Sequence, residues 1–108
     1  MKTVIVINND QMGQGDRTLG QKILTTFLRK SPVMKEVTAI VLYNSGVKLV
    51  IAGSPVLAEL TQLHESGIEV LPCGTCLDYY QLKAAFGQAS NMDQIIRELD
   101  RAEKVITL

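Results

Sequence analysis

Both cysteines of the 108-residue chain lie in one short stretch, EVLPCGTCLDYYQLK, which spans residues 69–83. Cys73 and Cys76 are three residues apart, between an apolar run and a segment with a helical pattern. Two thiols at this spacing can form a redox pair, supply half of a metal site, or act as a sulfur-carrying nucleophile and its companion. They can also simply fill a corner of the core, because free cysteine is among the most buried residue types.

The residues around the pair favour chemistry over packing. Thr75 followed by Asp78 matches a capping box. A helix that starts there leaves Cys73 just outside its N-terminus and places Cys76 in its first turn. The partial positive charge and free N–H groups of a helix N-terminus lower the pKa of a nearby thiol, and Gly74 lets a ligand approach the backbone closely. The carboxylate of Asp78 opposes this effect, so we expect a modest activation.

Zinc binding is the less favoured interpretation of the two thiols. A closed zinc site takes about four ligands, and the chain offers these two cysteines and one histidine, His64. His64 falls at the end of the helix that precedes the third predicted strand, and that strand alone separates it from Cys73 by about 15 Å. We therefore expect no metal and no other cofactor. A thioredoxin-type redox pair has the right spacing, but such motifs usually follow an early strand.

Composition indicates one globular domain over residues 1–108. Hydrophobic residues make up 46% of the chain and charged residues 20%, and eleven acidic residues balance eleven basic ones. This balance does not indicate a nucleic-acid or membrane-binding surface. The apolar run before Asn8 is too short for a signal peptide or a membrane span, so we expect a cytoplasmic protein with reduced thiols.

Apolar, β-branched runs alternate with helical patterns along the chain. Asp16, Ser54-Pro55 and Asn91 are typical helix starts, and Ser31-Pro32 and Gly67 are typical stops. Strands that alternate with helices predict an α/β fold with a mainly parallel sheet between helical layers. The predicted strands are 3–7, 37–42, 68–71 and 105–108, whereas 46–52 fits either a short strand or a helical turn.

Ligands of such folds bind outside the carboxyl ends of the strands. The first predicted strand runs into Asn8 and Asn9, the second into Asn44 and the third into Cys73. We expect these three asparagines, together with Tyr79 from the following helix, to line a pocket around the thiols.

The glycine-containing loop NNDQMGQGDRTLGQK follows the first strand. Thr18 stands where a dinucleotide fingerprint needs its third glycine, and Gln21 replaces the lysine of a phosphate loop. Both nucleotide-binding motifs therefore fail. The loop is expected to shape the pocket or to contact a partner, or to be a plain turn.

Several separated motifs resemble the DsrE-like family, and in particular the C-terminal domain of YedF-type selenium-metabolism proteins. The resemblance covers nearly the whole chain. It implies a three-layer α/β/α domain that often assembles into trimers or hexamers and is related to proteins that relay sulfur as a cysteine persulfide. The similar segments are 9–10, 12–13, 15–16, 19–20, 44–49, 53–54, 67–71, 73–80 and 90–92.

The resemblance implies that Cys73, at the end of a strand, is the reactive cysteine. Cys76 has no counterpart in many relatives, so its role as a helper thiol follows from its spacing alone. Gln81 stands where close relatives are expected to have glycine.

The resulting hypothesis is a small sulfurtransferase-like carrier, although catalytic turnover stays open. Cys73 would hold sulfur or selenium as a persulfide, receive it from a donor protein and pass it to an acceptor thiol. Gly74, Thr75 and Cys76 would offer backbone N–H groups to the terminal sulfur. The alternative is a non-catalytic adaptor or redox sensor that acts through an oligomeric surface.

Overall fold

The computed structural model describes residues 2–108 and contains one four-stranded parallel sheet. The strands are β1 (Thr3–Ile7), β2 (Val37–Leu42), β3 (Glu69–Pro72) and β4 (Lys104–Thr107), in the spatial order β3-β2-β1-β4. All three strand pairs are parallel, so the carboxyl ends of the strands share one edge. The α/β fold predicted from the alternating pattern is confirmed.

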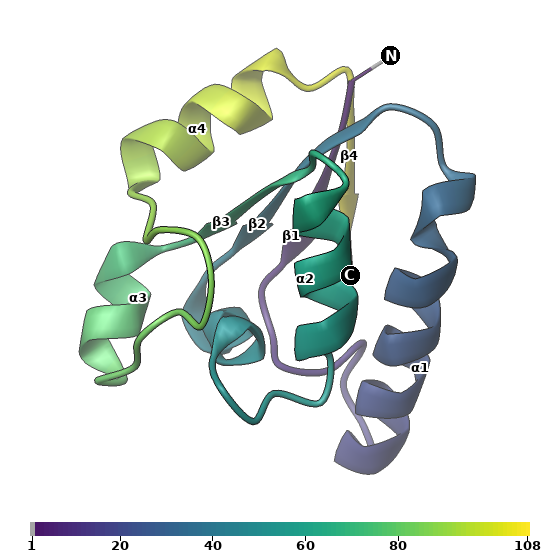
Figure 1. The fold of residues 1–108 in the computed structure, drawn as a ribbon, viewed down its shortest axis with the longest axis vertical. Coiled ribbons are helices and arrows are strands. Elements are labelled where there is room, and N and C mark those ends of the chain that lie inside the picture. Colours follow the sequence, from purple (N-terminus) through teal and green to yellow (C-terminus); the bar gives the residue numbers. More distant parts are fainter. Residues whose placement is uncertain (1) are drawn as a thin grey trace.

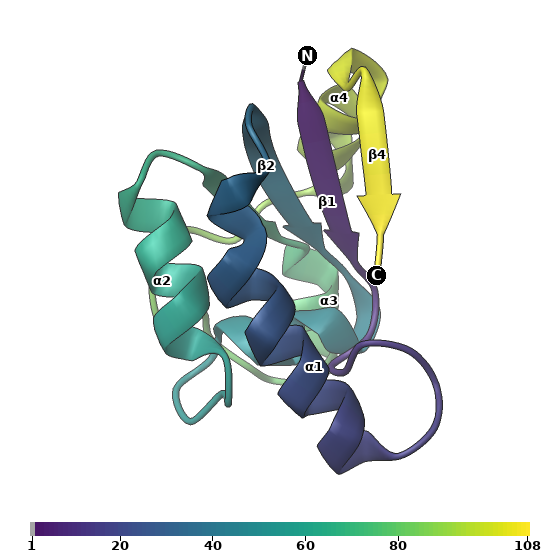
Figure 2. The ribbon, with the colours of Figure 1, turned by 90° about the vertical axis from the view of Figure 1, so that its right-hand side faces the viewer.

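Helices cover both faces of the sheet (Figures 1 and 2). Helices α1 (Arg17–Lys30) and α2 (Leu57–Glu65) lie on one face, while α4 (Met92–Arg101) lies on the other, with the short α3 (Gly74–Tyr79) next to it. Right-handed crossovers explain this division, because the chain moves outward from β1 to β3 and then returns past β1 to β4. The point where the strand order reverses therefore lies between β1 and β4.

The core is formed mainly by the two central strands. Every residue of β1 is buried, and the last four residues of β2 are completely buried. Such runs are expected for strands with helices on both faces, and both strands occupy their predicted ranges. The edge strands β3 and β4 each begin one residue from the predicted start.

The ambiguous segment after β2 forms a 3-10 helix, η2 (Asn44–Val50). Gly46 lies against the end of β1, where an added Cβ would come within 2.3 Å of the Ile7 carbonyl oxygen. Only glycine allows η2 to pack this closely over the carboxyl edge of the sheet.

Two of the four predicted helix caps are in place. The Asp16 side chain accepts a hydrogen bond from the Leu19 N–H at 2.8 Å, and the Asn91 side chain accepts one from the Gln94 N–H at 2.8 Å. The prediction that α2 starts at Ser54-Pro55 is wrong, because Ser54 Oγ accepts from the Val56 N–H in a turn that precedes the helix. None of the helices within residues 2–108 is long and apolar enough to cross a bilayer.

Helix α3 ends in a Schellman motif. The Leu82 N–H donates to the Leu77 carbonyl at 2.9 Å, and the Gln81 N–H donates to the Asp78 carbonyl at 3.1 Å. Gln81 has a left-handed backbone with φ 55°, a conformation that favours glycine at this position. The glycine expected there by family resemblance therefore has a physical reason.

We predict that Gln81→Gly stabilises the protein. The substitution removes the steric cost of a left-handed residue, which exceeds the entropy that glycine adds to the unfolded chain, so the gain is about 0.5–1 kcal/mol. Thermal and urea unfolding measure it. Gln88→Gly is the matched control, because Gln88 is also exposed and has no positive φ. A loss of stability as large as that of the control would contradict the prediction.

Candidate functional site

The cysteine pair lies where β3 passes into α3. The Cys73 N–H donates to the Leu42 carbonyl of β2 at 2.8 Å, and on its other side Cys73 forms a parallel bridge with Ser90. Cys73 is the N-cap residue of α3, which starts at Gly74. The capping box predicted from Thr75 and Asp78 is therefore wrong. Sheet pairing holds the backbone extended up to Cys73, and the helix begins as soon as that pairing ends.

Cys73 is buried, with 3% of its surface exposed. It packs within the hydrophobic core together with Leu71 and Leu77. The family resemblance implies that Cys73 is the reactive cysteine, but solvent does not reach this residue directly in the structure. Its neighbours explain the burial, because β2 flanks it on one side and the segment around Ser90 covers the other.

Cys76, by contrast, is half-buried and lines an open cavity of about 770 Å³. The cavity lies between the end of β2, helix α3 and helix α4. Its lining is mostly apolar and includes three tyrosines. The lining residues are Tyr43, Asn44, Thr75, Cys76, Tyr79, Tyr80, Met92, Ile95 and Leu99.

Burial raises the pKa of the Cys76 thiol above its ordinary value. A hydrogen bond and a charge interaction with Cys73 raise this pKa further, whereas the Asn44 N–H, which donates to Cys76 Sγ at 3.1 Å, lowers it. The lowered pKa expected at a helix start is thus wrong for Cys76. Helix α3 has only six residues, and its effect does not offset the loss of hydration.

Gly74 does not contact the cavity. Its N–H donates to the Ser90 carbonyl at 2.9 Å, and an added Cβ would lie 2.8 Å from the same oxygen. The missing side chain therefore serves packing between two chain segments, and this N–H is not free for a ligand. Thr75 is exposed at the cavity rim.

The asparagines after β1 line a second, smaller cavity. Asn8, Asn9 and Asn44 surround a polar hollow of about 410 Å³ at the reversal point of the strand order. Asn9 Oδ1 accepts hydrogen bonds from the Asp10 N–H at 2.8 Å and from Ser45 Oγ at 3.2 Å. Asn44 lines both cavities, so it connects the polar hollow to the cavity that holds Cys76.

An ion pair that the sequence did not reveal lies beside this hollow. Asp10 is only 5% exposed, and its carboxylate accepts two hydrogen bonds from the Arg17 guanidinium, at 3.0 and 2.5 Å. The hydrogen bond from Arg17 lowers the pKa of Asp10 despite the opposing effect of burial. Arg17 is the first residue of α1, so the pair ties the loop after β1 to that helix.

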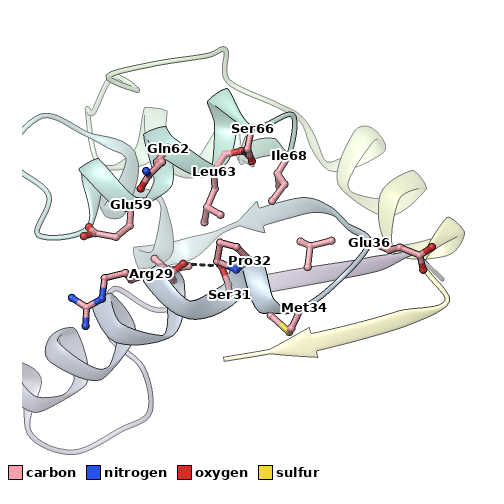
Figure 3. Close-up of a pocket in the computed structure, with 12 residues that line it drawn as sticks. Arg29, Ser31, Pro32, Met34, Glu36, Glu59, Gln62, Leu63, Ser66 and Ile68 are labelled. Carbon is pink, nitrogen blue, oxygen red and sulfur yellow. Dashed lines mark hydrogen bonds between the residues drawn. The ribbon is translucent and has the colours of Figure 1, made fainter.

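A further cavity at the opposite edge of the sheet contains no thiol. It measures about 620 Å³ and lies between the ends of α1 and α2, with Arg29, Glu36 and Glu59 among its lining residues (Figure 3). Within it, Ser31 Oγ donates to the Leu28 carbonyl at 2.7 Å. Its location at the amino ends of β2 and β3 separates it from the cysteine site.

His64 lies apart from the cavity that holds Cys76. Its ring packs against Phe86 with 5.1 Å between centroids, and it does not line the cavity at Cys76. Among residues 2–108, no three histidine, cysteine or acidic side chains come together as a metal site.

The fold and the site define an α/β protein with a cysteine pair at the carboxyl edge of a parallel sheet. The chain belongs to the DsrE/DsrF-like family, whose model matches residues 1–108. No curated protein shows significant sequence similarity to it.

Solved structures share the fold at low sequence identity. The crystal structure of the ychN protein from E. coli is 20% identical, with a TM-score of 0.74 over 99% of this chain and 98% of the other. The protein MTH1491 from Methanobacterium thermoautotrophicum is 17% identical, with a TM-score of 0.72 over 99% and 98% of the two chains. BT1422 from Bacteroides thetaiotaomicron is also 17% identical, with a TM-score of 0.65 over 99% and 95%. These similarities establish the fold.

We predict that Cys76 reacts with iodoacetamide in the folded protein and that Cys73 reacts only on unfolding. Because the pKa of Cys76 is raised, its rate should continue to increase with pH where an unperturbed thiol such as free cysteine has levelled off. The reaction is quenched at a series of times, and mass spectrometry of tryptic peptides then gives the alkylation rate at each cysteine. Loss of the native-state reaction in Cys73→Ala rather than in Cys76→Ala would refute the assignment.

We also predict that Asp10 makes the free energy of unfolding decrease as the pH falls. Its pKa in the fold lies below the unfolded value, so its contribution is complete above the unfolded pKa and is lost as pH falls through the folded pKa. Asp10→Asn should therefore be less stable than the parent protein at neutral pH, and the difference should narrow in acid. Urea unfolding at several pH values tests this, with Asp93→Asn, on the exposed first turn of α4, as control. A difference in the free energy of unfolding between Asp10→Asn and the parent protein that stays constant across these pH values would contradict the prediction.

Proposed function

We propose that this protein is a sulfurtransferase-like carrier in which Cys76 receives a sulfur atom and Cys73 is the second thiol. The observation that carries the proposal is the position of Cys76, which lines an open cavity while its partner thiol lies behind it in the core. Membership of the DsrE/DsrF-like family, which is associated with sulfur relay, supports this chemistry.

The loading step transfers a sulfane sulfur between thiols. The Cys76 thiolate attacks the outer sulfur of a donor persulfide, forms a new S–S bond, and breaks the bond between the donor's two sulfurs. The donor leaves as a thiolate, and Cys76 becomes a persulfide without net oxidation or reduction. Access and thiolate fraction govern such exchange, and Cys76 has the better access of the two cysteines.

Delivery follows the same chemistry in reverse. An acceptor thiolate attacks the outer sulfur of the Cys76 persulfide, and the Cys76 thiolate leaves. In a second route, the Cys73 thiolate attacks Cys76 Sγ, forms an intramolecular disulfide and releases hydrosulfide. That route oxidises the pair, so a dithiol reductant must then restore it.

This assignment reverses the roles predicted from the sequence. The family position favours Cys73 as the persulfide carrier, but its burial requires a partner-induced opening before a donor reaches it. Cys76 needs no such opening. Its interaction with Cys73 supports a handover between the two thiols.

Donor and acceptor proteins are proposed as the partners, and homo-oligomers as the state of assembly. Exposed apolar side chains at the cavity support a protein-docking face: Tyr79 is 82% exposed and Met92 is 48% exposed. Because the chain resembles YedF-type proteins, the proposed cargo includes selenium. Cys76 would then carry a selenium atom in place of the outer sulfur of the persulfide.

Sulfur loading tests the proposal. The reduced protein is incubated with a persulfide donor such as glutathione persulfide, and its intact mass is measured. We expect the gain of one sulfur atom per chain in the parent protein and in Cys73→Ser, and at least a tenfold loss of this species in Cys76→Ser, because the receiving thiol is gone.

Two other results would change the assignment. Loading that depends on Cys73 and survives in Cys76→Ser would return the carrier role to Cys73. No adduct in any variant, with the pair instead cycling between dithiol and disulfide, would favour the redox-sensing adaptor.

Val33→Ser is the control, because Val33 is 87% exposed and does not line the cysteine cavity.

A further inference from the structure

Asn44 has an unusual backbone at the point where it meets the thiol. It is the first residue of η2 and has φ 53°, one of three non-glycine residues with positive φ among residues 2–108. Its N–H donates to Cys76 Sγ at 3.1 Å. Asparagine adopts a left-handed backbone more readily than other non-glycine residues, and here contacts with its surroundings constrain it.

The side chains around Asn44 supply that constraint. Asn44 Oδ1 accepts a hydrogen bond from the Tyr80 hydroxyl at 2.9 Å. The ring of Tyr80 in turn lies 4.6 Å from Lys48 Nζ, in a cation–π contact back to η2. These contacts join the end of α3 to η2 and hold the Asn44 N–H toward the sulfur.

The Asn44 N–H is a hydrogen-bond donor already in place for a negative charge on Cys76. No lysine, arginine or histidine is among the described residues that line the cavity, and burial opposes the thiolate. Hydrogen bonds to ionised groups are roughly twice as strong as neutral ones, so this donor strengthens when the sulfur becomes charged. The titratable or charged groups that face Cys76 or its neighbours are Cys73, Tyr43, Tyr79, Tyr80 and Lys48.

We infer that Asn44 and Tyr80 are positioning residues that stabilise the thiolate of Cys76. Tyr80 orients the Asn44 side chain, and the left-handed backbone of Asn44 directs its N–H at Sγ. This inference rests on the proposed function for its role in transfer: the same sulfur carries negative charge before loading and again when it leaves during delivery. The two residues therefore favour both steps.

The test measures the thiolate of Cys76 without any sulfur donor. In a Cys73→Ala background, thiolate absorbance is titrated for Tyr80→Phe, Asn44→Ala and the double variant. We expect the thiolate fraction at pH 8 to fall about threefold to tenfold in each single variant, because one charge-assisted hydrogen bond is weakened. Because both residues act through one N–H, the double variant should fall no further than the lower single variant.

Thr61→Val is the control for Tyr80→Phe. It also removes one hydroxyl, but from α2, which covers the face of the sheet away from the cavity that holds Cys76. The titration curve of Cys76 should not move in this variant. An unchanged curve in Tyr80→Phe, or additive effects in the double variant, would overturn the inference.

The two proposals fail separately. If the titration shifts as expected but no variant accepts sulfur, the positioning role stands and the carrier function is lost. If Cys76 accepts sulfur and the titration does not shift in Tyr80→Phe, the carrier stands and the positioning role is lost. Circular dichroism of each variant confirms that the compared proteins are folded.

Discussion

The site depends on main-chain pairing that continues one residue beyond β3. Cys73 is held by the Leu42 carbonyl on one side, and on the other the Ser90 N–H donates to the Pro72 carbonyl at 2.7 Å while the Gly74 N–H donates to the Ser90 carbonyl. These bonds fix where the extended backbone ends and therefore where α3 begins. Cys76 follows in the first turn of α3, where its sulfur accepts a hydrogen bond from the Asn44 N–H. Ser90 thus helps to position the Cys76 thiol through main-chain bonds, while its own hydroxyl donates to Gln94 Oε1 at 2.7 Å.

Two opposing effects act on that thiol, and burial is the stronger. A helix N-terminus contributes at most about 1 kcal/mol at an exposed site, and α3 is short. Loss of hydration in a mostly apolar cavity costs the thiolate more, so the pKa rises. Asn44 offsets part of this cost with a single donor. Cys76 is therefore unlike a strongly acidic redox cysteine, and its chemistry must come from geometry and access.

Those parts of the fold with a local cause could be predicted from sequence. Continuous β-branched runs gave β1 and β2 their correct ranges, and short-range side-chain hydrogen bonds made Asp16 and Asn91 recognisable caps. The start of α3 and the burial of Cys73 could not be predicted, because both depend on Ser90, seventeen residues further along the chain. The left-handed backbone of Asn44 has the same kind of origin, since its hydroxyl partner lies on another element.

The raised pKa has a consequence for the proposed relay. A more basic thiolate is a better nucleophile once formed, but it is a poorer leaving group. A persulfide on Cys76 would therefore resist delivery unless a hydrogen-bond donor stabilised the departing sulfur. The Asn44 N–H is already aimed at that atom. Cargo retention would come from burial and cargo release from Asn44, so that the contact between η2 and α3 would set the balance between holding sulfur and passing it on.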